Sequence, residues 1–207
     1  MTTQTKETQA AMTADSAIQM LKDGNSRFVA KNMEGRDLIA QVEQTGSEGQ
    51  FPFAVVLSCI DSRVPAEMVF DQGIGDIFSA RVAGNVESGD VLGSMEFACK
   101  LAGSKVVVVL GHTKCGAVKG ACAGAEMGNL TGLLAKIKPS VEAIKAEGHS
   151  MDDITTEKIK LVSTHNVHAV CDNIRKQSDV LREMEANGEI KIVGAMYHVE
   201  DGRIEWL

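Results

Sequence analysis

The hydrophobic pattern of the chain predicts four β-strands. The two strongest runs, residues 53–57 (FAVVL) and 105–111 (KVVVVLG), are continuously apolar and lack the alternation typical of a half-exposed strand. Shorter runs predict further strands at 77–82 and 190–197. The dipeptide Asp-Gly at 201–202 is typical of a tight turn, so we expect the last residues to close a hairpin.

Helical spacing of apolar residues separates these strands. It predicts a weaker helix around 38–42 and stronger helices over residues 14–32, 91–101, 117–147 and 153–186. A recurring order of strand, helix, strand is typical of a parallel sheet with crossover helices. We therefore predict an α/β fold with a mostly parallel central β-sheet flanked by helices and with an N-terminal helical arm.

The amino-acid composition is uniform along the chain. The sequence contains no internal repeat and no low-complexity linker, and 207 residues suffice for one globular core. We expect a single domain spanning residues 1–207, of which the polar, Thr-rich residues 1–13 form a loose N-terminal segment.

Composition and charge argue against several classes of protein. With 21 Lys and Arg against 28 Asp and Glu, the net charge is −7 and no basic run is present, which disfavours nucleic acid as a partner. No apolar stretch approaches the roughly 20 residues that a membrane span requires, which argues against a membrane protein. The polar start resembles neither an export signal nor a transit peptide, so we expect a cytoplasmic protein.

The five cysteines are odd in number and irregularly spaced, which disfavours a disulfide framework. Cys99, Cys122 and Cys171 fall within or beside predicted helices and are expected to be small buried hydrophobic residues. Cys59 and Cys115 instead follow the two strongest predicted strands. These two cysteines are therefore the candidates for a metal ligand or a nucleophile.

Side chains that can bind a metal or take part in catalysis follow both of these predicted strands. Cys59, Asp61 and Arg63 follow the first, and His112 and Cys115 follow the second. The carboxyl ends of parallel strands meet at one edge of a sheet, and the short step from His112 to Cys115 lets both side chains reach one ion. Two thiolates and an imidazole favour zinc over magnesium or calcium, which prefer oxygen ligands.

Two other functions fit parts of the pattern less well. A phosphatase-like thiolate would also follow a strand, but three residues between Cys59 and Arg63 are too few for the anion-binding loop of such an enzyme. A dinucleotide site is not supported either, because Gly73-x-Gly75 lacks the third glycine and the strand context of that motif.

The sequence Cys59-x-Asp61-x-Arg63 followed by His112-x-x-Cys115 resembles the zinc-binding signature of the β-class carbonic anhydrases. Further segments match that family in its own order, namely residues 62–67, 81–85, 93–98 and 111–116. The resemblance covers most of the chain from about residue 14 onward, and several motifs in order are far more specific than any one alone.

This resemblance implies a function and a set of site residues. Cys59, His112 and Cys115 would bind Zn²⁺, with Asp61 and Arg63 as the dyad beside the metal. The implied reaction is the reversible hydration of carbon dioxide to bicarbonate and a proton by a zinc-bound hydroxide. Asp61 would accept a hydrogen bond from the zinc-bound water, or coordinate the zinc in a closed, inactive state. The family also implies a homodimer or dimer-based higher oligomer, with the site near the interface and the N-terminal helix on the partner.

Four further positions correspond to the substrate pocket of a plant-like subgroup of the family. Gln50 stands nine residues before the first ligand cysteine and would donate to bicarbonate, and Phe78 matches an aromatic position. Ala83 replaces a valine and Phe97 replaces a tyrosine, so the pocket departs from the subgroup's pattern there. Phe78, Ala83 and Phe97 would form the apolar wall that receives carbon dioxide. The other subgroup carries a tryptophan where this chain has Val56.

Two alternatives to carbon dioxide hydration use the same residues. The same scaffold would also suit hydrolysis of a sulfur analogue, carbonyl sulfide or carbon disulfide. A non-catalytic protein would instead hold a structural zinc closed by Asp61. No histidine is placed in the sequence as an obvious proton shuttle.

Overall fold

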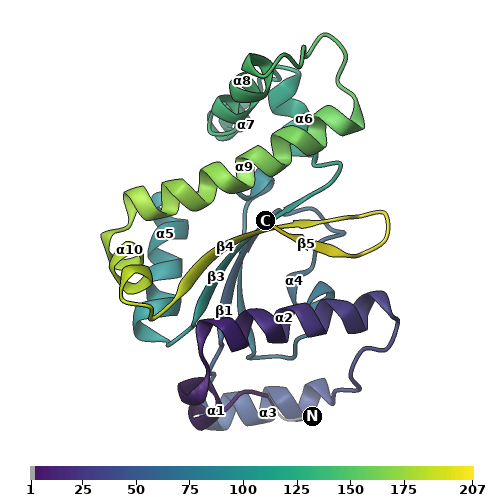
Figure 1. Ribbon diagram of the computed structural model, residues 1–207. Helices are drawn as coiled ribbons and strands as arrows, with labels where there is room; N and C mark the ends of the chain where they lie inside the picture. The colour runs from purple at the N-terminus through teal and green to yellow at the C-terminus, as the bar shows by residue number, and fades with distance from the viewer. Residues whose placement is uncertain (1–2) are drawn as a thin grey trace.

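The computed structural model describes residues 3–207 and confirms the predicted α/β fold (Figure 1). Its five-stranded sheet has the order β2-β1-β3-β4-β5, in which β4 and β5 pair antiparallel and the other neighbours pair parallel. The strands are β1 Ala54–Ser58, β2 Ile77–Arg81, β3 Val106–His112, β4 Lys191–Tyr197 and β5 Ile204–Trp206. The expected terminal hairpin is therefore present as β4 and β5.

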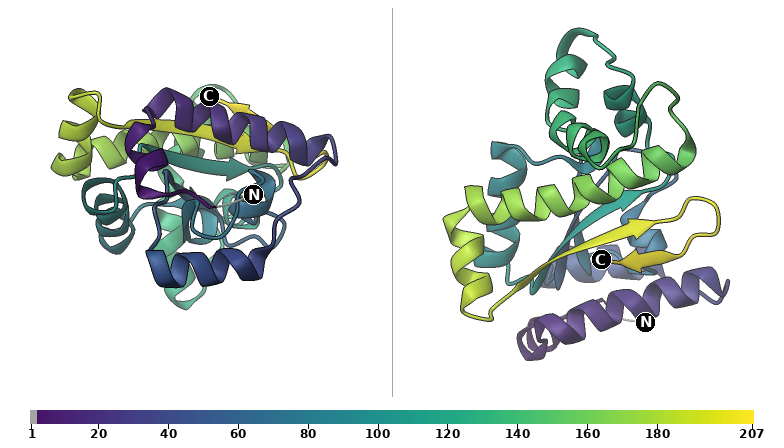
Figure 2. Two further views of the ribbon diagram at one scale, coloured as in Figure 1. Left: turned by 90° about the horizontal axis from the view of Figure 1, so that it is seen from below. Right: turned by 45° about the horizontal axis from the view of Figure 1, so that its top comes forward.

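Helices cover both faces of the sheet (Figures 1 and 2). Every residue of β1 and β3 is buried, because side chains of alternate residues enter two separate cores, and this explains the unbroken apolar runs. The first core is completed by α5 Gly89–Glu96, the π-helical turn η2 Phe97–Leu101, α9 Thr156–Gln177 and α10 Asp179–Ala186. The second core is completed by α2 Ala14–Val29 and α4 Ala66–Val69.

Three shorter helices pack against the first half of α9 and stand beyond the carboxyl edge of the sheet (Figure 2). They are α6 Gly116–Cys122, α7 Gly128–Ala135 and α8 Lys138–Ala146. Within the helical stretch predicted over 117–147, α6 and α7 are separated where Gly124 and Gly128 adopt φ angles of 64° and 43°. The stretch predicted over 153–186 is interrupted at Ser178, whose extended backbone ends α9 and whose side chain caps α10.

Residues 6–11 form the short helix α1 (Lys6–Ala11), where the polar composition predicted a loose segment. Thr5 caps this helix, and the buried Gln9 donates from Nε2 to the carbonyls of Pro52 and Ala102, both at 2.8 Å. These partners are far away in sequence, so composition alone could not indicate that the segment is held in place. No helix between residues 3 and 207 has the length and apolar character needed to cross a bilayer.

The helix α2 lies against the chain's own sheet, where it buries Ala17 and Leu21 completely. The contact of an N-terminal helix with a partner subunit, which the family resemblance implies, stays a prediction. The next helix, α3 (Leu38–Glu48), is longer than predicted and leaves Leu38, Ile39 and Val42 exposed.

A close approach between α9 and the sheet positions the end of β3. Val167 occupies a notch formed by Gly111 and Gly194 on neighbouring strands. A Cβ atom at Gly111 would lie 2.5 Å from Val167 Cγ2, and one at Gly194 would lie 2.7 Å from Val167 Cγ1. The two glycines therefore set how closely α9 lies on β3 and β4, immediately before His112.

Candidate metal centre

Three of the predicted site residues converge at the carboxyl edge of the sheet. Cys59 directly follows β1, His112 is the last residue of β3, and Cys115 is the N-cap of α6. Their potential ligand atoms all lie within 4.8 Å of one another, and all three residues are buried. This is the convergence that the parallel topology predicts for side chains that follow neighbouring strands.

The hydrogen bonding of His112 leaves one ring nitrogen ready for a metal. Nδ1 lies 2.8 Å from the carbonyl oxygen of Thr113, and because a carbonyl only accepts, the proton of the neutral ring is on Nδ1. Nε2 is then a bare lone pair, which is buried without a partner among residues 3–207. A buried polar atom without a partner is costly unless a further group binds it, so the residues present fit a metal ion.

The two cysteine sulfurs are held in a shared electrostatic environment. The Cys115 thiol donates toward the Cys59 sulfur, which lowers the pKa of Cys59 and raises the pKa of Cys115. The backbone N–H of Gly84 donates to Cys59 Sγ at 3.3 Å and also favours the thiolate of Cys59. A pair of sulfurs that already stabilises one negative charge, beside an imidazole, is a donor set that suits zinc.

The turn η1 (Ala83–Asn85) is shaped to present that N–H group. Gly84 has a φ angle of 69°, and a Cβ atom there would lie 2.6 Å from Ile137 Cδ1, so both the backbone and the space favour glycine. Asn166 holds the turn from α9 by donating from Nδ2 to the carbonyl of Gly84 at 3.0 Å. Ala83, one of the predicted pocket residues, is thereby placed beside the first candidate ligand.

Asp61 and Arg63 form the predicted pair next to the candidate ligands. Arg63 donates to both carboxylate oxygens of Asp61, and Asp61 Oδ2 lies 3.9 Å from His112 Nε2. The hydrogen bonds from Arg63 hold the pKa of Asp61 well below its usual range, and the same contact raises the pKa of Arg63. Asp61 is therefore a fixed, charged acceptor at the edge of the candidate metal site.

Arg81 contacts the same segment, but its side chain was given no role by the sequence analysis. Its guanidinium donates from Nε to the carbonyl of Cys59 at 3.0 Å and from Nη2 to the carbonyl of Asp61 at 2.7 Å. Arg81 ends β2 and is paired in register with Ser58, the last residue of β1. The signal that could have found it is its position at the end of the neighbouring strand.

The other predicted pocket residues lie away from the candidate ligands of the same chain. Gln50 is exposed and precedes β1, so it lies at the opposite end of that strand from Cys59. Phe78 and Phe97 contact each other edge to face, with ring centroids 6.3 Å apart. They line an open hollow of about 570 Å³ over β2 and α5, and none of the three candidate ligands lines it.

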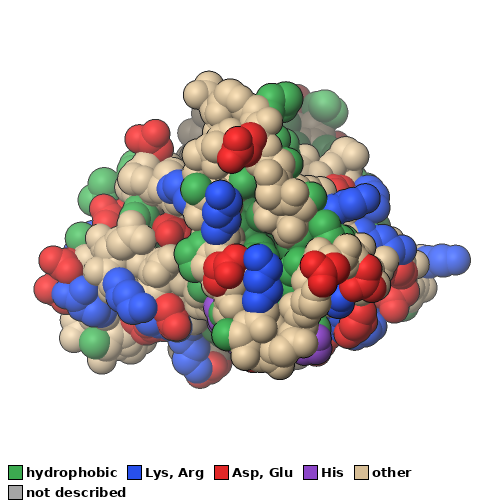
Figure 3. Space-filling view, turned by 90° about the horizontal axis from the view of Figure 1, so that it is seen from above, with side chains coloured by type: hydrophobic (Ala, Val, Ile, Leu, Met, Phe, Trp, Pro, Cys, Tyr) green, Lys and Arg blue, Asp and Glu red, His purple; other side chains and the backbone are tan. Residues whose placement is uncertain are grey.

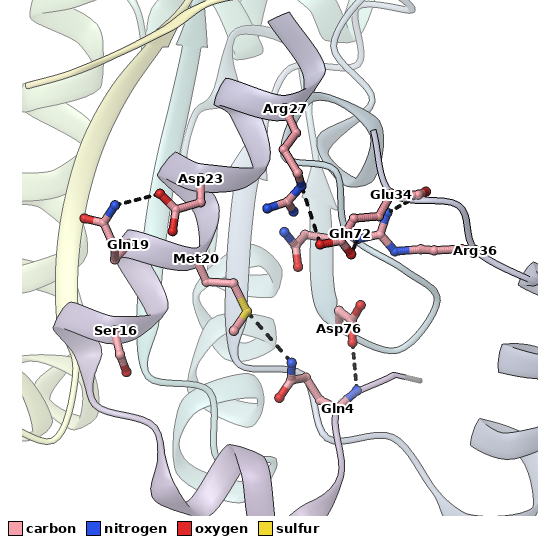
Figure 4. Close-up of a pocket in the computed structure, with 10 residues that line it drawn as sticks. All are labelled: Gln4, Ser16, Gln19, Met20, Asp23, Arg27, Glu34, Arg36, Gln72 and Asp76. Carbon is pink, nitrogen blue, oxygen red and sulfur yellow. Dashed lines mark hydrogen bonds and ion pairs between the residues drawn. The ribbon is translucent and has the colours of Figure 1, made fainter. Parts of the chain in front are cut away.

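Another cavity of the chain is lined by charged side chains that pair with one another. A cavity of about 480 Å³ lies beneath α2 near the amino ends of β1 and β2, and its two arginines, Arg27 and Arg36, pair with acidic side chains (Figure 4). On the face seen from above, acidic and basic side chains are interspersed rather than gathered by sign (Figure 3).

Comparison with known proteins agrees with this geometry. Residues 54–204 match the family model described as carbonic anhydrase. Carbonic anhydrase 2 of Mycobacterium tuberculosis is 37% identical over 192 residues, which cover 90% of this chain and 89% of that protein. A crystal structure of a β-carbonic anhydrase of Aspergillus fumigatus has a TM-score of 0.69 at 29% identity, covering 88% of this chain and 89% of that one. A tetrameric β-carbonic anhydrase of Sordaria macrospora shares the fold, with a TM-score of 0.71 at 23% identity over 81% of this chain and 89% of that one.

Proposed function

We propose that this chain, which belongs to the β-carbonic anhydrase family, catalyses the reversible hydration of carbon dioxide with one zinc ion held by Cys59, His112 and Cys115. The products are bicarbonate and a proton. The observation that supports the proposal most strongly is the bare, buried Nε2 of His112, which finds no partner among residues 3–207 and lies with both cysteine sulfurs in one cluster.

Zinc at this site would supply a Lewis acid that lowers the pKa of water, so that a proton is released to solvent and hydroxide is available to attack carbon dioxide. The task of the chain is to orient the attacking water. Asp61 is suited to that task because Arg63 fixes its carboxylate and its Oδ2 lies 3.9 Å from His112 Nε2. A charged carboxylate only accepts hydrogen bonds, so it would turn the proton of the water toward itself and leave a lone pair directed at the carbon.

The same ion pair would keep the coordination site open. A carboxylate this close to the ligands, if it were released, could rotate and become a fourth ligand, and a closed site has no position for water. The two parallel hydrogen bonds from Arg63 oppose that rotation. We infer that Arg63 acts on the reaction through Asp61 rather than by contact with the substrate.

A second copy of the chain would complete the substrate pocket. Gln50, Phe78 and Phe97 lie away from the candidate ligands of their own chain, and Phe97 is 53% exposed. A homodimer or a dimer-based higher oligomer would bring these residues against the zinc site of the partner, as a plant-like member of the family would require. The Sordaria macrospora relative is described as tetrameric.

The proposed compartment is the cytoplasm. Cys59, Cys99, Cys115, Cys122 and Cys171 are all free, and a reducing compartment preserves thiols that are to bind zinc.

One sample serves to test the proposed function. Zinc per chain and the rate of carbon dioxide hydration would be measured together, and we expect one zinc per chain and measurable hydration. Cys59→Ser should bind zinc with one sulfur fewer or not at all and should lose hydration, whereas Cys122→Ser, a half-buried cysteine outside the site, should change neither zinc content nor hydration. Zinc without hydration at any pH would favour a structural metal, and turnover of carbonyl sulfide alone would favour the sulfur-analogue reaction.

A further inference from the structure

The loop between β4 and β5 contacts the turn that carries two of the three candidate ligands. Thr113 and Lys114 lie between His112 and Cys115, and both contact Glu200 of that loop. Thr113 Oγ1 donates to Glu200 Oε2 at 2.7 Å, and Lys114 Nζ lies 3.2 Å from Glu200 Oε1. The two oxygens of one carboxylate therefore hold two consecutive residues of the ligand turn.

The turn between His112 and Cys115 contains a residue in an unfavourable backbone conformation. Lys114 has a φ angle of 55°, in the left-handed region that residues other than glycine rarely adopt. The buried Thr113 donates its N–H to the carbonyl of Tyr197 at 2.9 Å, and its hydroxyl accepts from the N–H of Val199 at 3.0 Å. Tyr197, Val199 and Glu200 thus anchor the turn at neighbouring points of the hairpin.

Thr113, which makes these contacts with the hairpin, also makes a hydrogen bond to a candidate ligand. Its carbonyl accepts the Nδ1–H of His112 at 2.8 Å, and that bond directs Nε2 toward the two sulfurs. Groups that bind the second nitrogen of a ligand histidine fix the orientation of its ring and tune metal affinity. A shift of Thr113 would therefore turn the His112 ring.

We propose that Glu200 is a positioning residue of the metal centre, which holds Thr113 and Lys114 so that His112 and Cys115 converge on one ion. This inference rests on the proposed function, because it takes those residues as zinc ligands. Glu200 acts through the turn and not by contact with the ligands. The hydrogen bond from Thr113 lowers the pKa of Glu200 to about 2, so the carboxylate remains charged toward Lys114 at neutral pH.

Two substitutions separate the contacts of Glu200. Glu200→Ala removes both contacts, whereas Glu200→Gln keeps an oxygen that accepts from the Thr113 hydroxyl and removes the charge that faces Lys114. Zinc affinity would be measured by chelator competition on the zinc-loaded protein. We expect a loss of about 10-fold for Glu200→Ala and a smaller loss for Glu200→Gln.

Replacement of zinc by cobalt gives a second measurement, the absorption spectrum of bound Co²⁺, which a loss of global stability alone would not change. The absorption bands of Co²⁺ report the geometry of its ligands, so they should shift in Glu200→Ala and be largely restored in Glu200→Gln. Glu205→Gln is the matched control, because this carboxylate of the same hairpin pairs with His198 at 3.1 Å and, among residues 3–207, makes no hydrogen bond or ion pair to residues 112–115. Its affinity and spectrum should equal those of the unsubstituted chain.

Failure of the inference and failure of the proposed function give different results. Unchanged zinc affinity and an unchanged cobalt spectrum in Glu200→Ala, with zinc bound by the unsubstituted chain, would overturn the positioning role. An unsubstituted chain that binds no zinc would instead overturn the proposed function and the inference with it. If Glu200→Ala does not fold, Glu200→Gln carries the test, and a zinc affinity equal to that of Glu205→Gln would overturn the positioning role.

Discussion

Arg63 holds both oxygens of the Asp61 carboxylate, with Nε 2.9 Å from Oδ1 and Nη2 2.8 Å from Oδ2. The backbone N–H of Arg63 adds a third bond to Oδ1 at 3.0 Å. Because Asp61 Oδ2 is also 3.9 Å from His112 Nε2, the position of this carboxylate decides whether a metal here would keep an open coordination position.

Arg63→Ala should therefore retain zinc and lose most of its activity. The three candidate ligands are untouched, whereas the freed Asp61 loses its orientation and can fill the open position. We expect carbon dioxide hydration to fall by about 100-fold at unchanged zinc content, measured by stopped-flow kinetics and metal analysis. Near-normal turnover would refute the role of Arg63. Arg182→Ala, an exposed arginine paired with Asp179 on one helix, should have normal activity.

The two central strands and the cluster of Cys59, His112 and Cys115 were predictable because each apolar run is continuous and the side chains that follow it are adjacent to it in sequence. The apolar runs at 53–57 and 105–111 correspond to β1 and β3 within one residue at each end. The rule that parallel strands end at one edge then suffices to bring Cys59, His112 and Cys115 together.

Contacts between distant segments were not predictable in this way. The bonds from Gln9 to Pro52 and Ala102, which hold α1 in place, depend on how the finished sheet is packed. The contact between Thr113 and Glu200 likewise joins residues 87 positions apart. No periodicity of the sequence encodes such pairs, so residues that act through them were missed.

Replacement of Asp71 by asparagine should weaken the fold. The Asp71 side chain is fully buried, and Arg27 Nε donates to its Oδ2 at 2.6 Å while Arg36 pairs with the other oxygen. Removal of the charge leaves Glu34 as the acidic partner of both Arg27 and Arg36, and the loss of the buried carboxylate should lower the free energy of unfolding by about 3 kcal/mol. Asparagine tolerates the φ angle of 46° at this position, so the effect would report charge rather than backbone strain.

The same substitution should change how stability depends on pH. Burial alone would raise the pKa of Asp71, but hydrogen bonds from Arg27, Arg36 and the Glu34 backbone outweigh burial and lower it. The charged Asp71 therefore stabilises the fold at any pH above the ordinary pKa of aspartate. This contribution is lost as the pH falls through the lowered pKa of Asp71 in the folded chain. Denaturant unfolding at several acidic pH values should show a flatter dependence in Asp71→Asn. An equally steep loss of stability would contradict this, and the exposed Asp179→Asn should change stability by less than about 0.5 kcal/mol.

Gly111→Ala should destabilise the chain through a steric clash. The new Cβ atom would lie 2.5 Å from Val167 Cγ2 and 2.7 Å from Met196 Sδ. We expect a loss of about 2 kcal/mol in the free energy of unfolding, partly rescued by Val167→Ala. Gly132→Ala, within α7 and with no atom within 4 Å of the added carbon, should instead stabilise by up to about 1 kcal/mol. Equal effects of the two substitutions would contradict the close approach of α9.

Carbon dioxide hydration should rise on the alkaline side of neutrality. Zn²⁺ with two thiolates and one neutral imidazole has a net charge of about zero. Zn²⁺ with the three neutral imidazoles of other carbonic anhydrases keeps a net charge of about +2. Water at the less positive site should lose its proton at a higher pH. A rate measured by stopped-flow that stays constant between about pH 6 and 9 would contradict this charge argument.

Zinc K-edge X-ray absorption on the zinc-loaded chain tests the central claim most directly. We expect one zinc per chain, with two sulfur neighbours at about 2.3 Å and an imidazole nitrogen at about 2.0 Å. Cys59→Ser and Cys115→Ser should each remove one sulfur from that shell or abolish binding. A zinc shell without sulfur, or one that both substitutions leave unchanged, would contradict a metal centre built from Cys59, His112 and Cys115.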